Sequence, residues 1–185
     1  MSDEGLPIKP EHVFKKIIWR NVASLSEAMD HATTWSITGI AAISGLLITK
    51  LDAVGQFVSR GGLRWALLLF TASLVVGAFS KQVAAAVMKG LAMIEKLEAL
   101  LSSAEGQALM DRMSTPPRQL IEEIAAPFWW PLSTLMRKSG VKGLSDYLSS
   151  DKRFITMFQV HMVLVYLHGL CALAAFVVIA ASIVR

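Results

Sequence analysis

Charged residues are scarce in this chain and are missing from three long stretches. The 185-residue sequence is 54% hydrophobic and 17% charged, with 18 Lys and Arg against 14 Asp and Glu. Soluble domains typically carry about 25% charged residues. The composition therefore predicts a small integral membrane protein, with a basic excess that suits anionic lipid headgroups better than nucleic acid.

Other features are also missing. Cys171 is the single cysteine, which excludes an intramolecular disulfide. The chain begins with the acidic segment Met1–Glu4, and its first apolar run starts only after residue 32, so we expect no cleavable signal peptide. No catalytic, phosphate-binding or metal motif occurs, and no charge lies within an apolar run. We therefore expect a non-enzymatic protein without a metal, and not an ion-coupled transporter.

The three uncharged stretches predict three transmembrane helices. Thr34–Leu51 has no charge before Lys50, Trp65–Ser80 is followed by Lys81, and Phe154–Val184 is uncharged throughout. A bilayer-spanning helix needs about 20 apolar residues. We predict an all-α integral membrane protein with a two-span hairpin at 33–80 and a third span at 154–185, joined to amphipathic interfacial and cytoplasmic helices.

The segment 1–32 predicts an amphipathic helix starting near Pro10. Its apolar residues recur at three- and four-residue spacing on one helical face. These residues are Phe14, Ile18, Val22, Leu25 and Met29. With Trp19 as an interfacial anchor, the helix can lie on the membrane surface. The same face can instead pack on another helix of this chain or of a partner, and the pattern does not separate the two.

The region 81–153 predicts cytoplasmic helices and a membrane-surface anchor. The helical period continues beyond Ser80 towards Leu101, loosens over 102–115 and resumes in a short helix at 119–124. Residues 137–150 predict a solvated loop with a short helix. Between these lies Pro127-Phe128-Trp129-Trp130-Pro131, in which Trp129 and Trp130 suit the headgroup level. A re-entrant segment is the alternative, but it needs partners for its backbone.

Small residues predict helix-packing faces in the hairpin. They are Gly39, Ala41 and Gly45 in the first span and Ser73 and Gly77 in the second. Small residues let helix backbones approach closely in lipid, where close packing drives association. We expect these faces to pack within the hairpin or between copies of it.

The positive charges favour one orientation. Lys and Arg gather before the first span, after the second and before the third, whereas the connection 50–64 carries three. The positive-inside rule then predicts a bacterial inner-membrane protein with a cytoplasmic N-terminus and cytoplasmic residues 81–153, and with the C-terminus on the far side.

The third span contains the candidate cofactor ligands. His161 and His168 are seven residues apart and share a helical face, near Gln159, Tyr166 and Cys171. A histidine in a span can ligate haem b, hydrogen-bond a quinone or relay protons. His31, at the mouth of the first span, is a conceivable partner for His161. The competing interpretation is an interhelical hydrogen bond from a neutral imidazole.

These features favour a protein that acts through helix–helix association. The leading hypothesis is an accessory or scaffold subunit of a membrane complex, in contact with anionic lipid and with other subunits or copies of itself. The amphipathic helix, hairpin and continuing helix resemble the two-span SLATT-type effectors of bacterial conflict systems. That resemblance implies a self-assembling pore, although the third span departs from the plan. A haem- or quinone-binding redox anchor is the other alternative.

Overall fold

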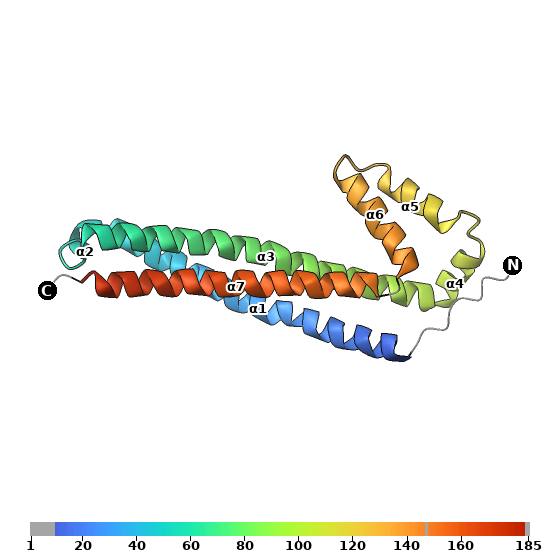
Figure 1. The fold of residues 1–185 in the computed structure, drawn as a ribbon, viewed down its shortest axis with the longest axis horizontal. Helices are drawn as coiled ribbons and strands as arrows, with labels where there is room; N and C mark the ends of the chain where they lie inside the picture. Colours follow the sequence, from blue (N-terminus) through green and yellow to red (C-terminus); the bar gives the residue numbers. More distant parts are fainter. Residues whose placement is uncertain (1–9, 147, 184–185) are drawn as a thin grey trace. The chain divides into compact units, whose positions relative to one another are not determined.

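The regular secondary structure of the described residues is all helical. The computed structural model describes residues 10–146 and 148–183, which form seven helices and no strand (Figure 1). The helices are α1 (Pro10–Thr49), α2 (Leu51–Val54), α3 (Arg60–Ser102), α4 (Ala104–Asp111), α5 (Pro117–Ala125), α6 (Leu132–Ser145) and α7 (Ser149–Ala181). Expectations about the acidic N-terminal residues and about Arg185 lie outside the described residues. The prediction of an all-α chain is confirmed.

Three of these helices are long and apolar enough to cross a membrane. They are α1, α3 and α7, with 40, 43 and 33 residues. They contain the three uncharged runs, as the sequence predicts. α1 has no break at residue 32, where we expected an interfacial helix to give way to a span, and α3 continues past Ser80 to Ser102 as expected.

The chain divides into two compact units, and α1, α3 and α7 contribute residues to both. The bundle unit contains Val22–Met88 and the chain from Thr156 onward. The other unit contains the chain up to Asn21 together with Lys89–Ile155, and it is called the hairpin unit after the helical hairpin of α5 and α6.

The bundle unit is a three-helix bundle with a heptad core. Its parts of α1, α3 and α7 lie side by side (Figure 1), and α3 runs antiparallel to the other two. The buried residues of α3 alternate at spacings of three and four: Leu63, Ala66, Phe70, Ser73, Gly77, Ser80, Ala84 and Val87. This spacing averages 3.5 residues per turn, which is typical of left-handed coiled-coil packing.

One end of the bundle core is apolar and the other contains polar side chains. The apolar end is built on Ile40, Leu47, Leu63, Phe70, Ala172 and Ala175. There the rings of Phe70 and Phe176 meet edge to face at 5.2 Å. Ser26, Thr33, Ser73, Ser80, His161 and His168 are the buried polar residues of the bundle unit. The polar end contains both candidate ligands.

The end of α7 contacts the connection between α1 and α3 in the bundle unit. Ser59 caps α3, because its Oγ accepts a hydrogen bond from the backbone N–H of Gly62 at 3.2 Å. The backbone N–H of Ser59 donates to the carbonyl of Ser182 at 2.9 Å. A Cβ at Gly62 would lie 2.0 Å from Ser182 Oγ, so only glycine allows this approach.

The hairpin unit contains the shorter helices. α5 confirms the predicted short helix, and it packs against α6, where Arg137 Nε pairs with Glu122 Oε2 at 2.8 Å. The expectation for 102–115 is wrong, because this segment contains α4, which Ser103 caps by accepting from Gly106 N–H. The expectation for 137–150 is met in part, because a helix is present but it continues through both glycines to Ser145.

Candidate functional site

His168 lies at the centre of a closed hydrogen-bond network in the bundle unit. It is 2% exposed, and the network, here called the His168 level, joins it to Ser73 of α3 and Ser36 of α1. His168 Nδ1 lies 2.8 Å from both the Oγ and the carbonyl oxygen of Ser73. His168 Nε2 lies 2.9 Å from Ser36 Oγ. One imidazole therefore connects all three long helices.

The partners fix the protonation of the neutral ring. A carbonyl oxygen can only accept, so Nδ1 carries the proton and donates towards Ser73. Nε2 is then the acceptor, and the Ser36 hydroxyl donates to it. The Ser73 hydroxyl donates to the backbone carbonyl of His168 at 2.8 Å. Both ring nitrogens are thus satisfied by the protein.

Gly77 makes room for this network. It lies one helical turn after Ser73 and is buried. A Cβ at this position would lie 3.0 Å from His168 Nδ1 and 2.9 Å from Ile37 Cδ1. The small pair Ser73 and Gly77, which the sequence predicts as a packing face, therefore admits an imidazole from α7.

His161 lies seven residues before His168 on α7, and it differs from His168 in its hydrogen bonding. It is fully buried, yet neither ring nitrogen has a hydrogen-bond partner among the described residues. Ser80, seven residues after Ser73 on the antiparallel α3, has an unpartnered buried hydroxyl, as does Ser26 of α1. Asp30 of α1 lies close enough to interact electrostatically with His161. We call His161, Ser80 and Asp30 the His161 level.

The His161 level borders the charged end of the spans. Lys81 Nζ lies 3.2 Å from Asp30 Oδ1 and also donates to the hydroxyl of Thr34. This ion pair joins α1 to α3 at the residue where the uncharged run of α3 ends. The His168 level lies two helical turns further into that run.

The residues do not fit a haem held by two histidines. Such a haem needs two imidazole nitrogens that each have a free lone pair. The acceptor nitrogen of His168 is occupied by Ser36, and His31 is exposed whereas His161 is buried. No group of three His, Cys, Asp or Glu residues suitable for a metal occurs in residues 10–146 and 148–183. Of the polar residues in this span, Gln159 and Tyr166 are exposed and Cys171 is half-buried.

The small residues of α1 are open to the outside in the part of the chain that the structure describes. Gly39, Ala41 and Gly45 are all exposed. A Cβ added at Gly39 or Gly45 would meet no atom beyond its own helix within 4 Å. The two predicted packing faces therefore have different uses, since Ser73 and Gly77 are occupied inside the bundle and the α1 face is open.

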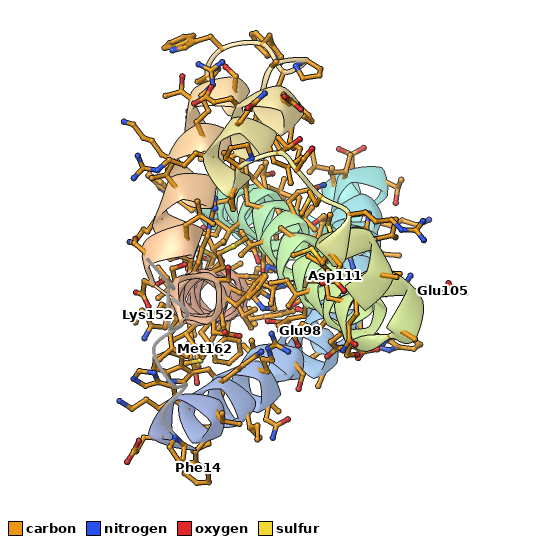
Figure 2. All side chains as sticks on the ribbon, turned by 90° about the vertical axis from the view of Figure 1, so that its right-hand side faces the viewer. Phe14, Glu98, Glu105, Asp111, Lys152 and Met162 are labelled. Atoms are coloured by element: carbon orange, nitrogen blue, oxygen red, sulfur yellow. The ribbon has the colours of Figure 1, made fainter. Side chains whose placement is uncertain are left out.

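The predicted interfacial tryptophans all belong to the hairpin unit. Trp129 and Trp130, in the turn between α5 and α6, are 74% and 75% exposed, and Trp19 on α1 is half-buried. Phe14, of the predicted amphipathic face, is 65% exposed and lies at the outer edge of α1 (Figure 2). Phe14, Trp129 and Trp130 of this unit are therefore presented outward, whereas Trp19 is partly covered.

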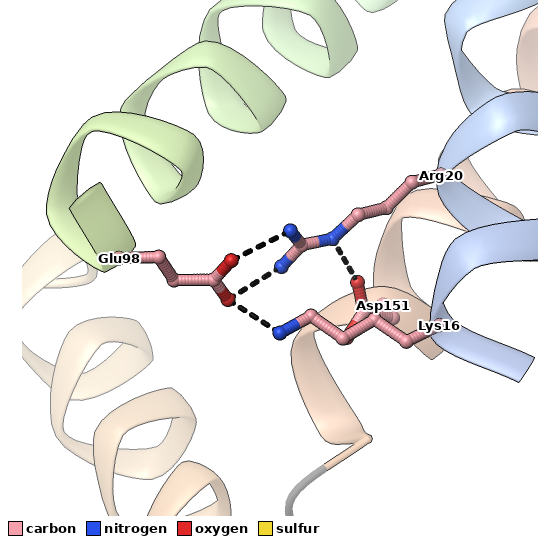
Figure 3. Close-up of polar contacts among 4 residues, drawn as sticks. All are labelled: Lys16, Arg20, Glu98 and Asp151. Atoms are coloured by element: carbon pink, nitrogen blue, oxygen red, sulfur yellow. Dashed lines mark hydrogen bonds and ion pairs between the residues drawn. The ribbon is translucent and has the colours of Figure 1, made fainter. Parts of the chain in front are cut away.

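An ion-pair cluster, here called the Arg20 cluster, joins the three long helices within the hairpin unit (Figure 3). Arg20 Nη1 and Nη2 each lie 2.8 Å from a Glu98 oxygen, and its Nε lies 2.9 Å from Asp151 Oδ1. Lys16 Nζ also pairs with Glu98, at 2.6 Å. The bidentate hydrogen bond from Arg20 lowers the pKa of Glu98 to about 2 and raises the pKa of Arg20.

The serine partners and the Arg20 cluster were not predicted from the sequence. The spacing did contain a signal, because Ser73 and Ser80 repeat the interval of His161 and His168 on an antiparallel helix. Comparisons with protein-family models, with curated proteins and with solved structures find no match.

Proposed function

We propose that this chain is a non-enzymatic, multi-pass protein of the bacterial inner membrane that acts through helix–helix association, as an accessory or scaffold subunit. The open small-residue face of α1 carries this proposal. The N-terminus and residues 81–153 are placed in the cytoplasm on the charge distribution described above.

The distribution of polar and apolar side chains in the bundle unit supports its insertion into lipid. Its outward side chains are large and apolar, among them Val163, Leu170 and Leu173 at 60–64% exposed, whereas Ser73, Ser80, His161 and His168 face inward. This distribution is the reverse of a soluble bundle. In hydrocarbon, polar side chains turn inward and bond across helices.

The α1 face suits contact with a second helix. Thr38, Ala41 and Gly45 follow one another at spacings of three and four and therefore share a face. The Thr38 hydroxyl donates to the carbonyl of Thr34 at 2.9 Å, so it needs no partner outside its own helix. Ala41 and Gly45 add little or no side chain to this face, and small residues let another backbone approach closely, which is how helices associate in lipid.

Cysteine cross-linking in native membranes tests this contact. In a Cys171→Ser background, Ala41→Cys is expected to form cross-links, either to another copy or to a different polypeptide. Gly45→Leu added to that variant should reduce cross-linking roughly tenfold, because a bulky side chain separates the backbones. Gly169→Leu is the matched control, since Gly169 is exposed on α7 and also has nothing within 4 Å of its Cβ position.

The identity of the cross-linked product decides between the functional alternatives. A different polypeptide supports an accessory subunit, and native mass spectrometry of the protein released in mild detergent should show it. A homo-oligomer that also releases dye from liposomes would replace this proposal with the self-assembling pore. Substrate turnover or a bound redox cofactor in the purified chain would contradict it, as would the absence of any cross-link at position 41.

A further inference from the structure

A cavity of about 750 Å³ lies in the bundle unit beside α2 and the start of α3. Arg60 and Arg64 line the part near the N-terminus of α3, together with Asp52 of α2. Leu67, Leu68 and Thr71 line the part further along α3. The volume falls within the ~300–1,000 Å³ of ligand-binding cavities. The cavity thus combines a basic entrance with an apolar wall.

The basic entrance has charge available for an anion. Neither Arg60 nor Arg64 forms an ion pair with any residue of the described ranges 10–146 and 148–183. Two positive charges therefore face one negative charge, that of Asp52. The positive end of the α3 helix dipole lies at the same place. Guanidinium groups match phosphate oxygens in bidentate geometry, which favours a phosphate over a simple carboxylate or halide.

The position along α3 matches the depth of a lipid molecule. Trp65 is 63% exposed next to Arg64, and tryptophan marks the headgroup level of a bilayer. Thr71 lies seven residues beyond Arg64, which is about 10 Å along the helix. The leucine wall therefore begins at the headgroup level and continues into the acyl region.

We infer that this cavity binds an anionic phospholipid of the far leaflet, with its phosphate on Arg60 and Arg64 and an acyl chain along Leu67, Leu68 and Thr71. The inference rests on the membrane insertion of the proposed function. The apolar wall favours a lipid over free phosphate, because a phosphate ion alone would leave the leucine surface unused. It would make this face a specific lipid site, in addition to the cytoplasmic basic segments.

Lipid retention by the full-length protein tests the inference. The protein in mild detergent is mixed with equimolar phosphatidylglycerol and phosphatidylcholine, and bound lipid is counted by native mass spectrometry. Phosphatidylglycerol should be retained preferentially. Arg64→Gln should weaken that retention roughly tenfold, as expected for one charged hydrogen-bonding partner. Lys50→Gln is the matched control, because it removes the same charge from the same connection without lining the cavity.

A second variant tests the apolar wall. Leu68→Trp should also reduce phosphatidylglycerol retention, because the larger side chain fills the cavity while both arginines remain. Retention that responds to Arg64→Gln and Lys50→Gln equally would overturn the site, since it would indicate general surface attraction. Inorganic phosphate that displaces the lipid completely at millimolar concentration, with no effect of Leu68→Trp, would identify a phosphate site instead.

Failure of this inference can be separated from failure of the proposed function. Protein that resists alkaline extraction from membranes but shows no preference for phosphatidylglycerol would overturn the lipid site alone. Protein that alkali releases would overturn membrane insertion and the lipid site together. A dimer cross-linked through Cys substituted at Arg64, without bound lipid, would assign the cavity to a second copy of the chain.

Discussion

The two buried histidines of α7 share a helical face and a helix, but their surroundings differ. His168 has partners for both ring nitrogens on α1 and α3, whereas His161 has none among the described residues. The serine that faces each level differs in the same way, since Ser73 is bonded and the hydroxyl of Ser80 is not. The two histidines, and the two serines, are each seven residues apart. One pair nevertheless forms the closed hydrogen-bond network at His168, and the other leaves His161 and Ser80 without hydrogen-bond partners among the described residues.

The difference follows the distance from the charged boundary of the spans. The His161 level lies beside the Asp30–Lys81 ion pair, and the His168 level lies two turns further into the uncharged run. In hydrocarbon an unsatisfied polar group costs several kcal/mol, which is why such groups must be bonded within the protein. His168 is bonded within the protein at this depth, although the buried hydroxyl of Ser44, in the uncharged run of α1, has no hydrogen-bond partner among the described residues.

This comparison assigns the two histidines different roles. His168 is a structural residue that holds the three helices in register. His161 retains hydrogen-bonding capacity that the chain itself does not use.

Gly77→Leu should break the His168 level and destabilise the bundle most strongly. Its side chain would occupy the space of the imidazole and of Ile37, so that overpacking and lost hydrogen bonds together cost about 3–5 kcal/mol. The measurement is the apparent Tm of the purified protein in mild detergent. Gly169→Leu, on the open face of α7, should leave Tm nearly unchanged. Equal effects of the two leucines would show that Gly77 has no special role.

The matched pair His168→Leu and His161→Leu separates the two levels directly. His168→Leu removes two interhelical contacts and leaves Ser36 unpaired, at an expected cost of roughly 2–3 kcal/mol. His161→Leu removes a buried group without partners, so its effect should lie between neutral and a stabilisation of about 1 kcal/mol. Thermal unfolding in detergent again provides the measurement.

The serines of α3 provide the control for this pair. Ser73→Ala should destabilise by about 1 kcal/mol and Ser80→Ala by less, because only the first removes a hydrogen bond. If both histidine variants lose the same stability, the distinction between the levels is wrong. A loss confined to His161→Leu and Ser80→Ala would reverse it.

The sequence predicted the long helices but not which faces they bury. The absence of charge from three runs is a strong signal, because bilayer thickness imposes a minimum length. The small residues give no comparable signal, because the sequence does not show which of them pack against another helix. Ser73 and Gly77 accommodate His168, whereas Gly39 and Gly45 are open, and the two groups look alike in sequence. Whether a small residue is covered depends on the residue of another helix that lies opposite it. For Ser73 that residue is His168, 95 positions further along the chain.

The polar contacts between distant segments could not be predicted for a related reason. Arg20 reaches Glu98 and Asp151, which are 78 and 131 residues further along the chain. Helical periodicity gives the face of each residue but not the register between helices. The histidines were identified as candidates because they are costly in a span, yet only the structure shows that His168 is already satisfied.

Acidification should have the smallest effect, and it isolates the Arg20 cluster from both histidine levels. The pKa of Glu98 is lowered to about 2 by its hydrogen bonds with Arg20, so its contribution is fully present above its ordinary pKa near 4.5. That contribution is lost as pH falls from about 4.5 towards 2.

Because the Glu98 side chain is 44% exposed, solvent screening should hold the loss below about 1 kcal/mol. Unfolding measured from pH 7 to pH 2.5 should therefore show a shallow decline that Glu98→Gln reduces, and the remainder includes Asp146, whose pKa is also lowered by its hydrogen bond from Lys152. Glu95→Gln is the control, because Glu95 is exposed on the same helix and has no ion pair among the described residues, so the decline should persist in that variant. An undiminished decline in Glu98→Gln would place the acid-sensitive contact elsewhere.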